Sequence, residues 1–103
     1  MSEEQDMSGK QRLRVVRNEA ESRFEAYLDD DLAAVLTYVS TPEGLDLQHT
    51  VVERAHRGKG IGEEFAEAVF DELRETGERV IPTCPFLSRY IAEHPEHQAL
   101  VAA

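Results

Sequence analysis

The sequence predicts an α+β domain with four antiparallel strands in a meander, a long helix, a short fifth strand parallel to the fourth, and a C-terminal helix. Apolar residues alternate with polar ones over much of residues 13–52, as they do in half-buried strands. Between residues 61 and 73 they recur every four residues instead, as on one face of a helix. The segment ERVIP at residues 78–82 then favours one more strand before the last helix.

Short polar connections separate the first four strands, which we expect near residues 13–16, 23–28, 31–40 and 45–52. Asn18–Glu21 makes a polar break after the first strand, and Asp29 and Asp30 form the turn after the second. The third strand is rich in Val, Leu and Tyr, which suits a strand that is buried on both faces. Thr41–Gly44 matches a type I turn. Connections this short join antiparallel neighbours.

The long helix is predicted from its apolar stripe and from the glycine that follows it. The stripe consists of Ile61, Phe65, Val69 and Leu73. Gly77 is expected to end this helix, and a strand entered through a helix runs parallel to the preceding one. Pro82 and Pro85 have no N–H to donate, so the fifth strand should end early. Phe86–Glu93 is the expected last helix, ended by Pro95.

Length and charge exclude several classes of function. With 103 residues, the chain has room for one domain; we expect a disordered polar tail over residues 1–11 and a single domain over residues 12–103. The net charge of −10 argues against nucleic-acid partners and anionic membrane surfaces, because both require clustered Lys and Arg. No apolar run is long enough to span a membrane.

Cysteine content and the N-terminal residues indicate where the protein works. The segment MSEEQDMSGK has no apolar region of the kind found in secretory signals. The single cysteine, Cys84, excludes an internal disulfide and suits a reducing compartment. We therefore expect a cytoplasmic protein, a monomer or weak dimer, with no nucleic-acid or membrane partner.

The segment between the fourth strand and the long helix, ERAHRGKGIGEEF at residues 53–65, is the most informative. It concentrates the cations Arg54, Arg57 and Lys59, and also His56, in an otherwise acidic chain. Its alternate glycines let the backbone approach a ligand closely, and a helix N-terminus offers unpaired N–H groups to an anion. The segment predicts a pyrophosphate cradle. The alternative is a solvated basic loop whose glycines only turn the chain. P-loop and Rossmann patterns are not matched.

Residues 57–62, RGKGIG, match in full the Q/R-x-x-G-x-G/A pyrophosphate motif of the GNAT superfamily of acyl-CoA-dependent N-acetyltransferases. Residues 13–97 resemble this superfamily, and residues 83–95, TCPFLSRYIAEHP, are similar to a small subgroup of the N-acetyltransferase domain-containing type. The resemblance implies a minimal GNAT-like fold with acetyl-CoA as co-substrate. It implies that CoA is bound by Val51, Val52, Arg57, Gly58, Lys59, Gly60, Ile61 and Gly62.

The sequence also departs from the full-length pattern of that superfamily. A full-length member has two helices between its first and second strands, which help to wall the acceptor site, but Asn18–Glu21 is too short for them. Nothing after Glu93 is long enough for the usual final pair of strands. We therefore expect an unusually open acceptor site, and the identity of the acceptor does not follow from the resemblance.

Two residues of the fourth strand and its end are candidate bases for deprotonating an amine. His49 is the first, because imidazole titrates near neutral pH. It is expected to share a strand face with Leu45, Leu47 and Val51, so a packed core residue is the alternative. Glu53, at the strand end, is the second candidate, and a solvated loop acid is its alternative.

Residues beyond the fifth strand are candidates for the rest of the transfer. Cys84 lies where the family arrangement would bring the thioester, so its thiol could accept the acetyl group or donate a proton to the CoA sulfur; the alternative is a small buried residue. The resemblance implies that Tyr90 could protonate the leaving thiolate, with core packing as the alternative. Pro95 interrupts any helix between His94 and His97, so we expect no metal site.

These observations lead to two functional hypotheses. The first is an acetyl-CoA-dependent N-acetyltransferase that acts on an unidentified small-molecule or protein amine, and the position of Cys84 favours it. The second is a non-catalytic CoA-binding or protein-interaction module built on a GNAT shell, which the missing acceptor walls favour.

Overall fold

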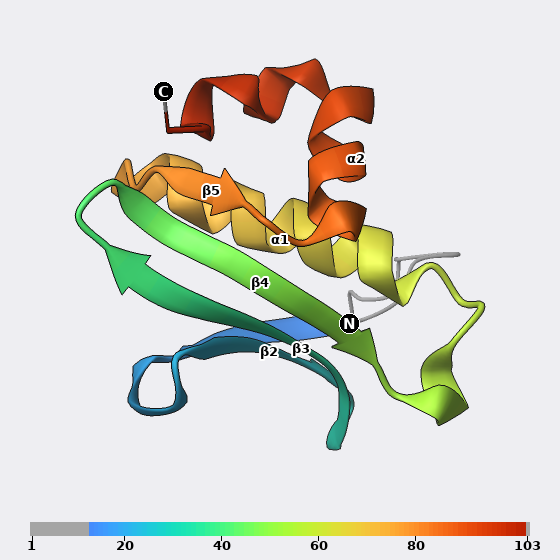
Figure 1. Ribbon diagram of the computed structural model, residues 1–103. Coiled ribbons are helices and arrows are strands. Elements are labelled where there is room, and N and C mark those ends of the chain that lie inside the picture. Colours follow the sequence, from blue (N-terminus) through green and yellow to red (C-terminus); the bar gives the residue numbers. More distant parts are fainter. Residues whose placement is uncertain (1–12, 103) are drawn as a thin grey trace, which may run out of the picture.

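Five strands form one mixed sheet whose spatial order follows the sequence, β1-β2-β3-β4-β5, in a computed structural model that describes residues 13–102 (Figure 1). Their bounds are β1 Leu13–Asn18, β2 Arg23–Leu28, β3 Asp31–Thr41, β4 Gly44–Val52 and β5 Val80–Pro82. Neighbouring strands from β1 to β4 are antiparallel, and β5 runs parallel to β4. The predicted meander and fifth strand are confirmed. The tail expected over residues 1–11 lies outside the described residues.

Two α-helices follow the meander, α1 over Ile61–Thr76 and α2 over Pro85–Glu93. Gly77, with a φ of 80°, ends α1, and its N–H bonds the carbonyl of Leu73. The described residues also form three short 3₁₀ helices, η2 over Glu19–Glu21, η3 over Arg54–His56 and η4 over Pro95–Leu100. Only η2 lies between β1 and β2, so the two helices of a full-length GNAT are absent there, as predicted.

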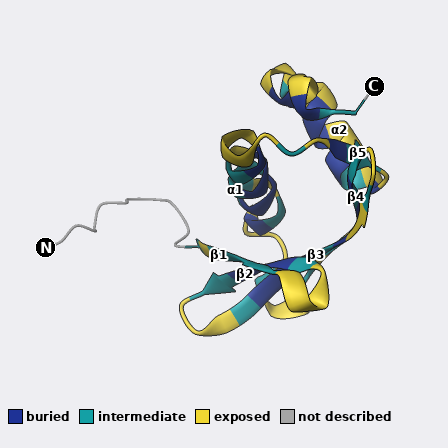
Figure 2. Cartoon of the chain, turned by 90° about the vertical axis from the view of Figure 1, so that its left-hand side faces the viewer, coloured by how far each residue is buried: buried dark blue, intermediate teal, exposed yellow. Residues whose placement is uncertain are grey.

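Both α-helices cover the same face of the sheet, which curves around α1 (Figure 2). The alternate β3 residues Ala34, Leu36 and Tyr38 point into this core. Val39, on the opposite face, is 48% exposed, and Thr37 is only partly buried. The prediction that this strand is buried on both faces is wrong, because the described chain places its helices on one side only. We call the uncovered side the outer face.

A bulge in β4 changes which residues face the core. Thr37 pairs with His49 but Tyr38 pairs with Leu47, so Gln48 is an extra residue. Leu47, before the bulge, is fully buried, whereas His49, after it, is exposed. An inserted residue reverses the alternation of side chains. The expectation that His49 shares a face with Leu45 and Leu47 is therefore wrong, and so is its core alternative.

Strands β4 and β5 pair over only three residues and then separate. The ladder ends at Leu47 and Pro82, and the N–H of Cys84 makes a last bond of 2.9 Å to the carbonyl of Leu47. The chain then turns into α2 at Pro85, while β4 continues to Val52. The predicted early end of β5 is confirmed. Within residues 13–102, no helix has both the length and the apolar character needed to cross a bilayer.

Candidate functional site

A hollow of about 330 Å³ lies where β4 ends and α1 begins. Its lining consists of Val52, His56, Arg57, Gly58, Gly60, Ile61, Gly62 and Glu63. Gly60 precedes the first helical residue with a left-handed φ of 75°, and no side chain caps this helix end. A Cβ on Gly58 or on Gly60 would meet nothing within 4 Å. The backbone therefore borders open space beside a helix N-terminus, where an anion can approach N–H groups.

Polar side chains of the loop add to this cradle. The Nε of Arg57 donates to the carbonyl of Val52 at 3.1 Å, which ties the loop to the end of β4. The Nδ1 of His56 is buried and has no hydrogen-bond partner within the described chain. Glu63 and Glu64 are acids in the first turn of α1, so the positive charge comes from the loop that precedes the helix. An anionic group with several oxygens fits these donors.

A second hollow, of about 220 Å³, continues the first toward the sheet. It is lined by Thr50, Val52, Gly62 and Phe86, and it shares Val52 and Gly62 with the first hollow. A Cβ on Gly62 would come within 3.2 Å of the Phe86 ring, so this glycine lets α1 and α2 approach each other. The two hollows form one cleft that runs from the glycine loop to the gap between β4 and α2.

The cleft leads to a thiol and a hydroxyl in contact. The Sγ of Cys84 lies 3.6 Å from the Oγ1 of Thr50, and Cys84 is 5% exposed. Adjacent strand residues point to opposite faces, so His49 lies on the outer face while Thr50 and Cys84 lie on the core side. His49 and the thiol are therefore separated by the β4 backbone.

Comparisons with known proteins identify the family of this chain. A family model described as GCN5-related N-acetyl-transferase matches residues 23–100, most of the sheet and both α-helices. The chain belongs to this family.

One relative and two solved structures show what the chain is similar to. Protein NATD1 of Danio rerio is 32% identical over 91 residues, which are 86% of this chain and 83% of the relative. A GCN5-like protein of Staphylococcus aureus, solved by NMR, has a TM-score of 0.61 at 21% identity and covers 94% of this chain and 92% of its own. The ribosomal-protein-alanine N-acetyltransferase of Brucella melitensis biovar Abortus 2308 has a TM-score of 0.54 at 20% identity, with 79% of this chain and 61% of its own covered. Both structures share the fold.

Most of the residues expected to bind CoA border the cleft of this GCN5-related domain. Val52 and the loop residues Arg57, Gly58, Gly60, Ile61 and Gly62 line it. Lys59 is exposed and does not line it. Val51 is 48% exposed and points to the outer face with His49, so it can serve the cleft only through its backbone. Glu53 is exposed at the strand end, and its N–H donates to the carbonyl of Ala33 at 2.7 Å.

Tyr90 belongs to a different cluster, between α1, α2 and η4. Its hydroxyl donates to the Oε1 of Glu67 at 2.5 Å, and the Nε2 of His97 lies 2.9 Å from the same oxygen. Burial and this hydrogen bond raise the pKa of Tyr90, while the two donors lower that of Glu67. The ring of His94 stacks on Tyr90 with centroids 3.9 Å apart. Tyr90 is thus packed in the core, and its proton is directed away from the cleft.

The same cluster contains the one group of possible metal ligands among residues 13–102, Glu67, Glu96 and His97. The two ring nitrogens of His97 already face other groups, Nε2 facing Glu67 and Nδ1 lying 3.4 Å from the Nη1 of Arg74. An Arg donor requires an unprotonated Nδ1, which fixes the proton on Nε2. A metal bound to Nε2 would have to replace that proton and break the hydrogen bond to Glu67. This arrangement therefore suits a structural hydrogen-bond network better than a metal site.

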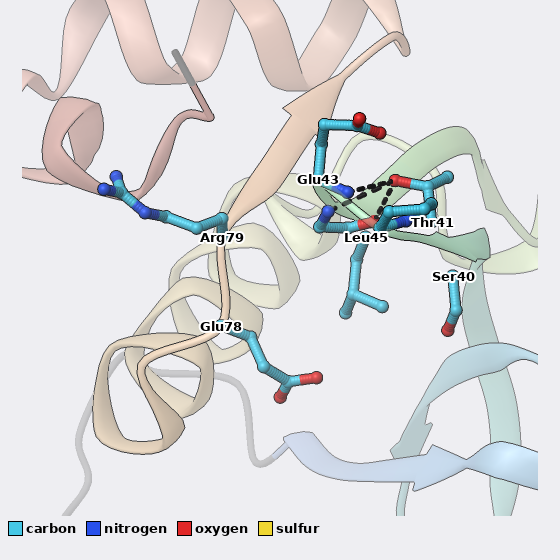
Figure 3. Close-up of a pocket in the computed structure, with 8 residues that line it drawn as sticks. Ser40, Thr41, Glu43, Leu45, Glu78 and Arg79 are labelled. Carbon is cyan, nitrogen blue, oxygen red and sulfur yellow. Dashed lines mark hydrogen bonds between the residues drawn. The ribbon is translucent and has the colours of Figure 1, made fainter.

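A separate hollow of about 320 Å³ lies at the opposite end of β4, beside the β3–β4 turn (Figure 3). Its polar groups are largely engaged within the protein. Thr41 bonds the backbone of the turn, Glu78 accepts two hydrogen bonds from Arg17, and Arg79 reaches the carbonyl of Ala99 at 2.9 Å. Because it lies at the other end of β4, this hollow does not contribute to the cleft.

Sequence reasoning missed three residues of this region. Thr50 reaches Cys84 only because the β4 bulge turns it to the core side, and no local pattern in the sequence predicts that bulge. Phe86 was expected in the last helix but not in the cleft, since its contact with Gly62 joins two helices. Glu67 looked like one more acid on the polar side of α1, although its Oε1 accepts a hydrogen bond from the Tyr90 hydroxyl.

Proposed function

We propose that this protein binds acetyl-CoA along the cleft and transfers the acetyl group to a primary amine. The observation that carries the proposal is the continuity of the cleft, from an open glycine cradle at a helix N-terminus to Thr50, whose hydroxyl contacts the Cys84 thiol. The backbone N–H groups of residues 58–62, with Arg57 and His56, would hold the pyrophosphate. Thr50, Val52 and Phe86 would line the path of the pantetheine arm.

Acetyl-CoA supplies an acetyl group activated as a thioester when it is bound. Cys84 and Thr50 lie at the end of the cleft, where their thiol and hydroxyl can donate hydrogen bonds. His49 stands on the outer face beside the gap between the strands, so it would take the proton of an amine that approaches from that side. Glu53 is the second candidate for this role. Tyr90 has no part in the transfer that we propose.

A CoA-binding or interaction module without turnover remains the second candidate function, and one observation favours it. The groups suited to proton transfer are divided, because His49 is on the outer face, Cys84 is on the core side, and the Tyr90 hydroxyl donates to Glu67. Such a module would bind CoA as tightly as an enzyme but would not consume acetyl-CoA. A cytoplasmic location stays a prediction from the single cysteine.

Thermal unfolding with CoA, followed by an assay of acetyl transfer, tests the proposal. A ligand at 100 times its Kd stabilises the folded state by about 2.7 kcal/mol, so millimolar CoA should raise the melting temperature clearly. Transfer is then followed as thiol release from acetyl-CoA in the presence of a mixture of primary amines. An unchanged melt would contradict the cradle. A raised melt without thiol release would favour the module.

A further inference from the structure

The loop between β4 and α1 carries two guanidinium groups that have no carboxylate partner within residues 13–102. Arg54 and Arg57 are both exposed, and the ion pairs of the described chain involve neither of them. The Arg57 side chain bonds a backbone carbonyl, that of Val52. The whole chain has 21 acidic and only 11 Lys and Arg residues, so two adjacent cations without an acid form a local surface that attracts anionic groups.

The N-terminal segment, residues 1–12, joins the sheet at the same end from which this loop leaves it. Leu13, the first residue of β1, pairs with Leu28 at the end of β2. Val52, the last residue of β4, pairs with Ala34 near the start of β3. The turn between β2 and β3 joins these two positions, and α1, which begins after the loop, lies over β1 (Figure 2). The N-terminal segment therefore precedes a strand whose start lies at the loop end of the sheet.

The sequence of the N-terminal segment supplies the complementary charge. Its first six residues, MSEEQD, contain three acids, Glu3, Glu4 and Asp6, and no Lys or Arg. Three strand spacings, about 14 Å in total, separate β1 from β4. The residues from Asp6 to Leu13 can span up to about 25 Å when extended. The chain between the acids and β1 is therefore long enough for the acids to reach the loop.

We propose that the acidic N-terminal segment binds the loop at Arg54 and Arg57 and competes there with the phosphate groups of CoA. This inference rests on the proposed CoA cradle and adds regulation of that site by the chain itself. Because both partners belong to one chain, the effective concentration of the segment at the loop is on the order of millimolar. Weak ion pairs then suffice for competition, and a change of charge in residues 1–6 alters the affinity for CoA without changing the cleft.

Calorimetric titration of the full chain with CoA at low ionic strength tests the competition. The test variant combines Glu3→Gln, Glu4→Gln and Asp6→Asn, which remove the three acids and keep the length of the segment. We expect this variant to bind CoA about five-fold more tightly, which corresponds to about 1 kcal/mol, the upper range for one exposed ion pair. In 1 M salt, where charges are screened beyond about 3 Å, the test variant and the natural protein should have the same Kd.

A control variant with the same net charge makes the test specific. It combines Glu43→Gln, Glu75→Gln and Glu93→Gln, which remove exposed acids from the β3–β4 turn and from the C-terminal ends of α1 and α2. The control should bind CoA with the Kd of the natural protein. Equal gains of affinity in the two variants would mean that net charge, not a contact, sets the Kd. That result, or an unchanged Kd in the test variant, would overturn the proposal.

NMR spectra of the ¹⁵N-labelled full chain without CoA separate the failure of this inference from the failure of the proposed function. Removal of the three N-terminal acids should shift the backbone amide signals of Arg54 and Arg57, whereas the control variant should leave them in place. Shifted signals in a protein that never uses acetyl-CoA would support the contact and reject the proposed function. Unshifted signals would overturn the contact even where acetyl transfer is observed.

Discussion

Gly60 is the residue on which the cradle depends most directly, because its left-handed backbone opens the start of α1 to a ligand. Gly60→Ala should cost about 1–2 kcal/mol of folding free energy, since an L side chain is strained at positive φ. It also places a methyl group in the space beside the backbone N–H groups. We therefore expect CoA binding to fall by more than ten-fold, measured by calorimetry at a temperature where the variant is folded.

Gly77 provides a matched control for that variant. Its φ of 80° is close to the 75° of Gly60, and a Cβ at either position would meet nothing within 4 Å. It lies at the other end of α1, away from the cleft. Gly77→Ala should lose similar stability and keep full affinity for CoA. Equal losses of affinity in the two variants would mean that backbone strain, not occupation of the cradle, weakens binding.

Cys84 distinguishes two routes of transfer at the same site. In the covalent route the thiol sulfur bonds the acetyl carbon, the thioester C–S bond breaks, and CoA leaves with the thiol proton. The amine nitrogen then bonds the acetyl carbon, the bond to the Cys84 sulfur breaks, and that sulfur takes up the proton that the amine loses. In the direct route the amine attacks the thioester, and Cys84 forms no bond to the acetyl group. We favour direct attack, because His49 and the thiol lie on opposite faces of β4 and no base contacts Cys84 in the described chain.

Intact-mass measurement after incubation with acetyl-CoA separates these routes. Direct attack predicts that Cys84→Ala keeps its rate of transfer and that the natural protein gains no lasting adduct. A stable adduct of about 42 Da that is lost in Cys84→Ala together with transfer would establish the covalent route instead. Cys84→Ser serves as a control, because it keeps a hydroxyl near Thr50 while removing the sulfur.

At the scale of elements, the contact of α1 with α2 and η4 depends on Glu67, whose Oε1 accepts hydrogen bonds from Tyr90 and His97. Tyr90→Phe removes one donor and leaves His97 in place, so the pKa of Glu67 should rise toward its usual value. We expect a loss of about 1 kcal/mol in the free energy of unfolding and an unchanged rate of acetyl transfer. Denaturant titration and the thiol-release assay measure the two effects separately.

Tyr27→Phe is the control for this variant, because Tyr27 also donates to a glutamate, Glu25, at 3.0 Å. That pair lies on the outer face, remote from α2. A fall in rate of about 10²-fold or more in Tyr90→Phe alone, with stability retained, would make Tyr90 the acid that the family resemblance implied. The position of its hydroxyl on Glu67 is the reason to expect otherwise.

At the scale of the whole molecule, one ion pair joins β1 at the edge of the sheet to the connection between α1 and β5. Arg17 donates to the two carboxylate oxygens of Glu78 at 2.7 and 3.0 Å, and its guanidinium lies over the rings of Phe24 and Tyr38. The Arg17 hydrogen bond is the main reason why the pKa of Glu78 is lowered. The pair closes the fold at the end opposite the glycine loop.

A lowered carboxyl pKa stabilises the protein above the unfolded value of about 4.5, and that stability is lost as the pH falls through the folded value. Arg17→Met should therefore cost about 1 kcal/mol at pH 7, allowing for solvent screening of a partly exposed pair. The cost should shrink toward pH 3. Arg89→Met, at an exposed position of α2, removes the same charge and should change stability little at either pH, as urea titrations can measure.

Local patterns in the sequence determined the elements and their order. The period of two over residues 13–52, the period of four in α1 and the stop at Gly77 all depend on neighbours a few residues apart, so they can be read without a structure. The same is true of the glycine motif at residues 57–62, whose spacing led to the family and to the cradle. The predicted elements and the family were confirmed, because backbone propensity, turn chemistry and motif spacing are local, whereas the cradle stays a prediction.

Only the tertiary structure decided which side chains meet at the end of the cleft. The bulge at Gln48 moved His49 to the outer face and Thr50 to the core, and this depends on how β3 and β4 align, not on either strand alone. Tyr90 meets Glu67 across 23 positions, and Thr83 meets Asp46 across 37. Such contacts form when distant segments pack together, because burial and hydrogen bonding act through space rather than along the chain.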